Sequence, residues 1–170
     1  MNIFLLDRNH SLNAQYHMDA HLNKMPLEAA HILCTAAFIK GIAGPYRPIS
    51  PDHPCVKWTL RSVTNWNWLI AYGISLCTEH EHRYGTHRWK LLNVFNWCKN
   101  KTETIQLKIP LIGLVEHPRI VAPDCRDELT VVDCYRKYYV QHKSHLAAWK
   151  HIGVPEWYQE MSMSLDSTEV

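Results

Sequence analysis

Residues 12–40 read LNAQYHMDAHLNKMPLEAAHILCTAAFIK, and this stretch decides the fold. Its apolar residues recur at alternating intervals of four and three, the period of one face of an α-helix. Pro26 lies inside that stripe, removes one backbone donor and crowds the preceding turn, so we expect a kink there. Gly41 and Gly44-Pro45 then end the predicted helix. The apolar stripe consists of Met18, Leu22, Met25, Ala29, Ile32, Ala36 and Ile39.

A second stripe, made of ionisable residues, follows the same helix. Each member precedes a core position by one residue, about 100° of helix rotation, so this stripe flanks the buried face. One interpretation is a set of boundary residues that hydrogen-bond to neighbouring helices. The other interpretation is the lining of a ligand cleft. The stripe consists of His17, His21, Lys24, Glu28 and His31.

The rest of the chain is also predicted to be helical. A proline-rich loop over residues 46–54 leads into a central helix from about residue 55 to 84, with Gly85 after its end. A basic, aromatic helix spans about 86–99, and a last helix runs over about 127–151. Residues 100–123 form either a short strand at 105–112 or a long loop. We therefore expect an all-α fold: a compact single-domain bundle of about four main helices over residues 1–159, followed by a flexible acidic tail at 160–170.

The composition excludes several classes of protein. The chain has 170 residues, of which 46% are hydrophobic and 20% charged, as is typical of a soluble globular domain. No apolar run reaches the ~18–20 residues of a membrane helix, and the first residues lack the basic region of an export signal. Six cysteines without a Cys-x-x-Cys pair fit reduced, buried thiols. We expect a cytoplasmic protein (in the host cytosol if a phage encodes it), no membrane partner and no cofactor.

Charge is distributed unevenly, although the formal net charge is only +2. Residues 1–123 carry 13 basic and 8 acidic side chains, whereas residues 124–170 carry 5 and 8. Between residues 83 and 108 six cations stand against Glu103 alone, which gives a local field able to attract a polyanion. These cations are Arg83, Arg88, Lys90, Lys99, Lys101 and Lys108. DNA or a nucleotide is therefore the expected partner.

Two kinds of chemistry compete on the ionisable stripe. His17 and His21 are four residues apart, the spacing of two zinc ligands on one helix turn, and His53 or His87 would supply a third ligand. Alternatively, Lys24 among aromatic residues acts as a nucleophile or Schiff-base former, and Glu28 serves as acid or base. The sequence leaves both open.

Several residues outside the stripe are candidate ligand-binding groups. Tyr46, Arg47 and His53 lie on the loop between the first two predicted helices, where polar function concentrates, although His53 is equally typical of a rigid surface connector. Asn65 and Arg83 are polar groups in an enclosed helix, and Arg83 alternatively forms an i,i+4 pair with Glu79. The remaining candidates are the cations Arg88 and Lys90.

Two resemblances accompany these patterns. The opening Met1-Asn2-Ile3-Phe4, the run from His17 to Pro26, the loop residues Tyr46-Arg47 and His53-Pro54, and Pro155-Glu156-Trp157-Tyr158 resemble the endonuclease V type of pyrimidine-dimer DNA glycosylase. A wider match joins the chain to a family of small, uncharacterised phage proteins. That match is similar over Tyr16-His17-x-Asp19-x-His21-x-x-Lys24-Met25, His53-Pro54-Cys55-x-x-Trp58, Arg83-Tyr84-Gly85 and Val154-Pro155-Glu156-Trp157-Tyr158.

The glycosylase resemblance implies a specific chemistry. That family attacks C1′ of a damaged nucleotide with its N-terminal α-amine, forms a Schiff base and uses a glutamate of the first helix. Here Lys24 stands at the position aligned with that glutamate, and Glu28 follows one turn later. Because Asn2 is too large for ready removal of the initiator methionine, the amine belongs to Met1. A protein α-amine titrates close to neutral pH, so this chemistry is possible.

Three hypotheses follow for function, and whether the protein is an enzyme stays open among them. The first is a DNA glycosylase or abasic-site lyase of the base-excision type, with Met1, Lys24, Glu28, His17 and His21 as catalytic residues. The second is a metal-dependent hydrolase or nuclease that uses His17, His21 and His53. The third is a phage protein that binds a nucleotide or base without catalysis.

Overall fold

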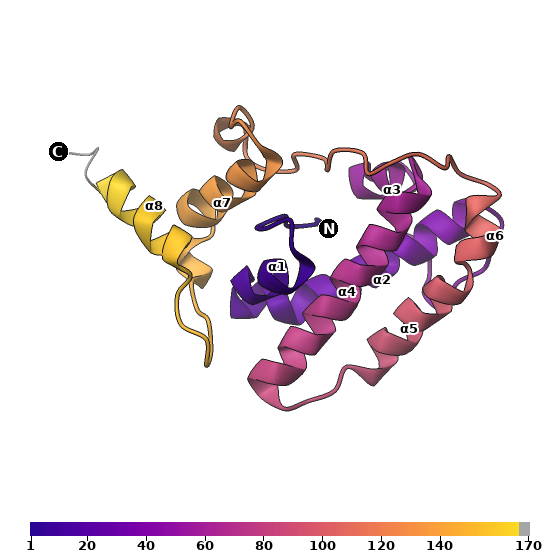
Figure 1. The fold of residues 1–170 in the computed structure, drawn as a ribbon, viewed down its shortest axis with the longest axis horizontal. Coiled ribbons are helices and arrows are strands. Elements are labelled where there is room, and N and C mark those ends of the chain that lie inside the picture. Colours follow the sequence, from indigo (N-terminus) through magenta and orange to yellow (C-terminus); the bar gives the residue numbers. More distant parts are fainter. Residues whose placement is uncertain (167–170) are drawn as a thin grey trace.

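The computed structural model of the protein describes residues 1–166, and all regular structure within them is helical, as the sequence predicts. The elements are α1 (His10–Tyr16), α2 (Asp19–Ile39), α3 (Pro54–Thr59), α4 (Val63–Tyr84), α5 (Trp89–Asn100), α6 (Thr102–Gln106), α7 (Val131–His142) and α8 (Glu156–Asp166), with the short turns η1 (Pro123–Cys125) and η2 (Ser144–Leu146). Figure 1 shows α2 crossing behind α4, with α7 and α8 on the other side of the N-terminal segment.

The predicted helix over residues 12–40 is two helices, α1 and α2, and the break lies at His17. The backbone of His17 is extended, with φ −66° and ψ 130°. Its ring stabilises this break, because Nδ1 donates to the carbonyl of Asn13 at 2.6 Å and thereby caps the end of α1. α2 then continues through Pro26 to Ile39. The single kinked helix is thus not confirmed, and the interruption lies nine residues before Pro26.

The predicted central helix is also divided, into α3 and α4. Ser62 separates them, because its hydroxyl accepts hydrogen bonds from the backbone N–H groups of Thr64 and Asn65 and so caps α4. The other end of α4 agrees with the prediction: Gly85 follows it with φ +65°, a left-handed conformation that glycine adopts without strain. These two breaks, together with the short α6 and the terminal α8, give eight helices in residues 1–166 rather than about four.

α4 is the central helix, as its apolar residues on several faces predict. It packs against α1, α2, α3, α5 and α6. Trp66, Leu69, Tyr72 and Leu76 are fully buried along it. This arrangement makes α4 the rigid support on which α2 and the N-terminal segment are positioned.

The N-terminal segment, residues 2–6, lies in the interior between the α2–α4 layer and α7. Ile3 and Leu6 are completely buried, and the ring of Phe4 stacks on His21 with centroids 4.4 Å apart. From α7, Tyr135 donates its hydroxyl hydrogen bond to Asn2 Oδ1 at 2.9 Å. The start of the chain is therefore held between the two halves of the fold, which places Met1 against the flank of α2.

The region after α5 contains the larger departures from the predicted boundaries. Of the two alternatives for residues 100–123 the loop is closer, because α6 is followed by an irregular segment up to η1. The last predicted helix, 127–151, is confined to α7 and the turn η2. α8 continues to Asp166, so residues 160–166 are helical rather than a frayed tail, and the remaining tail residues 167–170 lie outside the described residues.

None of the helices formed by residues 1–166 is long and apolar enough to cross a membrane.

Candidate functional site

The first peptide group of the chain is held from both sides. Its N–H, on Asn2, donates to Oε2 of Glu28 at 2.8 Å. Its carbonyl, on Met1, accepts a hydrogen bond from Nε2 of His53 at 3.1 Å. Because both polar ends of this group are occupied, the residue that carries the α-amine has a defined position beside a carboxylate. We call Met1, Asn2, Lys24, Glu28 and His53 the amine site.

A second amine reaches the same carboxylate. Lys24 Nζ lies 3.0 Å from Oε1 of Glu28, one helical turn before it on α2. The Glu28 side chain is only 10% exposed, whereas that of Lys24 is 70% exposed. The buried carboxylate therefore has one oxygen on the backbone of Asn2 and the other on a mobile cation at the surface, while Met1 itself is 43% exposed and open to a ligand.

His53 is positioned by the start of α3. Its Nδ1 accepts a hydrogen bond from the backbone N–H of Cys55, which makes His53 the N-cap of that helix and leaves the proton on Nε2 to reach Met1. Burial lowers the pKa of His53, and the neighbouring α-ammonium group lowers it further. The ring is thus neutral near pH 7 and acts as a hydrogen-bond donor to Met1.

His17 and His21 lie inside the protein rather than at an open site. His17 is completely buried, and its Nε2 accepts a hydrogen bond from the Tyr72 hydroxyl at 3.0 Å. Nδ1 of His21 is 2.7 Å from the Tyr139 hydroxyl. Burial lowers the pKa of His17 to about 3 and that of His21 to about 4. Both rings are therefore neutral near pH 7, and each contacts a tyrosine hydroxyl of a neighbouring helix.

The metal hypothesis placed His17 and His21 on one helix turn, and this is wrong because the chain breaks between α1 and α2. Both nitrogens of His17 are already engaged, one by Asn13 and the other by Tyr72. In the part of the chain that the structure describes, His17, His21 and His53 do not form a ligand set. The residues there that do gather metal-ligating atoms are Asp124, Cys125 and His142.

The loop candidates Tyr46 and Arg47 lie farther along the flank of α2. The Tyr46 ring stacks on His31, with centroids 4.9 Å apart and an interplanar angle of 24°. His31 Nδ1 lies 3.4 Å from the carbonyl oxygen of Arg47, whose side chain is exposed. His31 thereby joins this loop to α2, and the cationic side chain of Arg47 lies at the surface.

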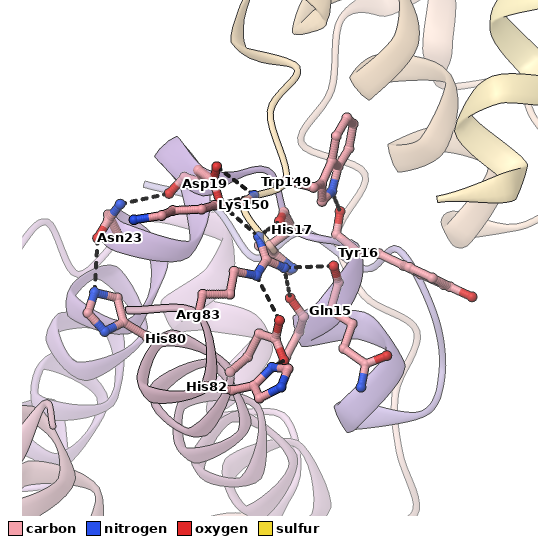
Figure 2. Close-up of polar contacts among 12 residues, drawn as sticks. Gln15, Tyr16, His17, Asp19, Asn23, His80, His82, Arg83, Trp149 and Lys150 are labelled. Carbon is pink, nitrogen blue, oxygen red and sulfur yellow. Dashed lines mark hydrogen bonds and ion pairs between the residues drawn. The ribbon is translucent and has the colours of Figure 1, made fainter. Parts of the chain in front are cut away.

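Arg83 holds the break between α1 and α2 and does not face a ligand. Its side chain is 0% exposed and reaches from α4 to the chain around residues 15–19 (Figure 2). The guanidinium donates to the carbonyls of Gln15 at 2.7 Å and His17 at 2.9 Å. It also pairs with the carboxylates of Glu79 at 2.7 Å and Asp19 at 3.0 Å. The i,i+4 pair with Glu79 is confirmed, and the role of Arg83 is structural.

Asn65 is likewise occupied by the protein itself. Its side-chain amide donates to the Trp58 carbonyl at 2.7 Å, and its Oδ1 accepts from the Val115 N–H at 2.9 Å. Asn65 is buried, so it ties the loop after α6 to the start of α4.

The two remaining candidate cations lie near the start of α5. Arg88 donates to the backbone carbonyl of Asn23 at 3.0 Å, near the start of α2. Lys90 is exposed. The basic segment after α4 therefore begins next to the flank of α2.

A cavity of about 370 Å³ lies on a different side of the N-terminal segment, between α4, residues 114–117 and the start of α7. Nε2 of His117 is buried and has no hydrogen-bond partner within residues 1–166. The His117 ring contacts that of Trp68, with centroids 4.2 Å apart. The cavity is lined by Leu5, Arg8, Trp68, His117, Leu129 and Val131, among others, and the residues of the amine site are not part of its walls.

The sequence alone did not identify the residues that hold the side chain of Asn2, next to Met1. Asn2 donates its side-chain amide to the Ile120 carbonyl at 2.7 Å and accepts from Tyr135, which is 133 residues away. The apolar start Ile3-Phe4-Leu5-Leu6 was a signal of burial. Nothing in the sequence gives the partner of that segment.

Comparison of the chain with protein-family models, with curated proteins and with solved structures finds no match.

Proposed function

We propose that this protein processes DNA by base excision, through a Schiff base between an amine of the amine site and C1′ of a damaged or base-free nucleotide. The observation that carries the proposal is the Glu28 carboxylate, which holds the Asn2 N–H at 2.8 Å and Lys24 Nζ at 3.0 Å. An amine and a largely buried carboxylate side by side are what Schiff-base chemistry on a sugar needs. The resemblance to the endonuclease V type of glycosylase supports the same assignment.

The proposed steps use only residues of this site. The unprotonated amine of Met1 attacks C1′ while the C1′–N bond to the base breaks, and the base leaves with that electron pair and gains a proton. The C1′–O4′ bond of the sugar then breaks and the imine forms at C1′. The amine nitrogen loses two protons in these steps, one to the departing base and one to O4′. The Glu28 carboxylate accepts a proton from C2′, a C2′=C3′ double bond forms, and the 3′ phosphate leaves with its bonding pair. Water finally hydrolyses the imine and restores the amine.

Cations along the α2 flank would hold the DNA backbone. Lys24 and Arg47 are exposed on this flank, and Arg88 borders it through Asn23. Phosphate contacts of this kind give an affinity that falls steeply with salt concentration. Substitution of Arg47 by methionine is expected to reduce both the affinity for duplex DNA and its salt dependence.

Borohydride trapping on DNA that contains an abasic site tests the proposal. Reduction converts the imine into a stable adduct, and peptide mapping then finds the modified amine. An adduct on the N-terminal peptide assigns the reaction to Met1, and an adduct on the 24-containing peptide assigns it to Lys24. The proposal is wrong if no adduct forms, if acetylation of the α-amine and Lys24→Met together leave the adduct yield unchanged, or if Glu28→Gln leaves strand cleavage unchanged.

The cavity favours a second candidate function, non-catalytic binding of a nucleotide or base. It offers the ring of Trp68 for stacking, the unpaired Nε2 of His117 for a hydrogen bond, and Arg8 at its edge for an anion. Titration with thymidine monophosphate, followed by tryptophan fluorescence, tests this function. Tight binding that Trp68→Leu removes, together with weak affinity for DNA, would favour this candidate over the first.

A further inference from the structure

The turn η1 and the last turn of α7 bring four side chains with metal-ligating atoms together. Nε2 of His142 lies 2.8 Å from Oδ2 of Asp124. Sγ of Cys125 lies 3.5 Å from Oε1 of Gln141. The ligand atoms of Asp124, Cys125 and His142 all lie within 4.8 Å of one another. These residues belong to neither the amine site nor the cavity.

The separations match the coordination shell of a small divalent cation. Tetrahedral zinc binds oxygen and nitrogen at ~2.0 Å and sulfur at ~2.3 Å, so its ligand atoms stand about 3.3–3.8 Å apart. The observed separations of 2.8 Å and 3.5 Å, and the upper bound of 4.8 Å, bracket that range. We propose that Asp124, Cys125 and His142 form a binding site for a zinc-type divalent metal, with Oε1 of Gln141 beside the fourth position.

The chemistry of the set fits such a metal. A thiol, an imidazole and a carboxylate together select borderline-soft ions over magnesium or calcium, which prefer oxygen alone. The thiol of Cys125 is buried, whereas the side chains of Asp124 and His142 are 55% and 37% exposed, so the ion has an entry path from solvent. The His142 ring is oriented by stacking on Tyr138, with centroids 5.4 Å apart.

Metal binding changes the protonation of Cys125. Burial and the adjacent Asp124 carboxylate raise the pKa of the Cys125 thiol to about 11, so the thiol is protonated in the metal-free protein. A bound divalent cation reverses this preference, and the thiol proton leaves to solvent. The neighbouring cation is Lys137, whose Nζ forms an ion pair with Oε1 of Glu128 at 2.7 Å.

In the fold, a bound metal would act as a cross-link. The metal would join η1 to the end of α7 and close the chain between residues 125 and 141. That segment begins where the irregular loop after α6 returns to the helical body, so the ion would fix the entry to α7. Metal binding to the folded state alone then raises the thermal midpoint of unfolding.

Titration of the reduced full-length chain, without a histidine tag, with Co²⁺ and then Zn²⁺ tests this site. We expect a sulfur-to-cobalt charge-transfer band, its loss on addition of Zn²⁺, and a zinc-dependent rise of the thermal midpoint. His142→Ala and Asp124→Asn should weaken zinc binding by more than about 10-fold, since even outer-shell changes cost that much. Cys125→Ser should abolish the band.

Two control variants separate ligation from general effects. Cys134→Ser removes another buried thiol of α7 and should keep the band, and His145→Ala removes an exposed histidine and should keep the affinity. If Cys125→Ser does not fold, the two exposed ligand variants still decide the question. The site is refuted if wild-type protein gives no charge-transfer band, or if the affinity is the same in His142→Ala, Asp124→Asn and His145→Ala.

Discussion

Glu28 and His53 hold opposite ends of one peptide group: the carboxylate accepts the N–H of Asn2 at 2.8 Å, and the imidazole donates to the carbonyl of Met1 at 3.1 Å. The two residues come from different elements, α2 and the N-cap of α3. A chain terminus is usually frayed, because nothing compensates the entropy lost on ordering it. Here two side chains order it, and this arrangement makes Glu28 the first residue to test.

Glu28→Gln should separate the charge of this residue from its hydrogen bond. Glutamine keeps an acceptor for the Asn2 N–H but cannot take a proton, so we expect strand cleavage at an abasic site to fall with little change in stability. Glu28→Ala leaves the N–H without its partner and should lower the free energy of unfolding by about 1–3 kcal/mol. Urea denaturation measures the free energy of unfolding of both variants, with Glu103→Gln as an exposed control. Equal stabilities of the alanine and glutamine variants would contradict the role of Glu28 in holding the first peptide group.

Arg83→Met should destabilise the fold more than substitution of any surface arginine. The guanidinium is 0% exposed, and its loss leaves the Glu79 carboxylate and the carbonyls at the end of α1 without a donor. Removal of one partner of a buried ion pair costs about 3–5 kcal/mol. Arg83→Lys should not restore this, because an ammonium group cannot span the same acceptors. Urea denaturation against the exposed control Arg61→Met decides, and a loss below about 1 kcal/mol would exclude the structural role.

The periodicity of the sequence predicted those features of the fold that depend on residues close together in the chain. The apolar stripe is buried from Met18 to Ala36, although its last member, Ile39, is 40% exposed. Gly85 ends α4. The ionisable stripe flanks the core, with His21 and Glu28 inside and Lys24 outside. These features follow from the period of a helix and from the conformational freedom of glycine. The flank of α2 was therefore identifiable as a candidate site before the fold was known.

The breaks in the helices depend on partners far away in the sequence. The end of α1 is stabilised by Arg83, which lies 66 residues beyond the His17 carbonyl to which it donates. The residues of the ionisable stripe do not line the cavity of about 370 Å³. Residues 2–6 lie over part of the stripe, and the Phe4 ring lies against His21. Such contacts leave no periodic signal. Local reasoning therefore could not foresee that the expected cleft is partly covered, that Arg83 is held by the protein itself, or that a helix break separates His17 from His21.

Buried histidines should make the protein sensitive to mild acid. The pKa values of His17 and His117 are lowered to about 3 and that of His21 to about 4, by burial in each case. Below pH 6.5 the unfolded chain takes up protons that the folded protein refuses, so stability falls as pH falls from about 6.5 toward 4. Each histidine contributes a slope of about 1.4 kcal/mol per pH unit.

The slope between pH 6.5 and 5 reports on histidines, because carboxylates remain ionised there. His10, His53 and His80, whose pKa values are also lowered by burial, add to it. Urea denaturation at several pH values measures it. His21→Gln should remove about one histidine's share of the slope, whereas His145→Gln, at an exposed position, should leave it unchanged. A stability that is constant over this interval would show that the three rings are protonated in the folded state.

Gly73 lies where α4 meets α5, and it is there because a larger residue does not fit. A Cβ at this position would stand 2.2 Å from Cε1 and Cζ of Phe95, whose ring is completely buried. Alanine favours a helix by about 1 kcal/mol over glycine, but overpacking a core costs about 1–3 kcal/mol. With so short an approach we expect overpacking to dominate, and Gly73→Ala to lower the free energy of unfolding by roughly 1–2 kcal/mol.

A double-mutant cycle with Phe95→Leu gives the stricter measurement. The smaller side chain leaves room for the new Cβ, so the two substitutions together should cost less than the sum of their separate effects. Gly113→Ala is the matched control, because nothing lies within 4 Å of its Cβ position, and it should change stability by less than about 0.5 kcal/mol. Strictly additive effects of Gly73→Ala and Phe95→Leu would mean that the α4–α5 contact relaxes without strain, and that Gly73 does not set the distance between these helices.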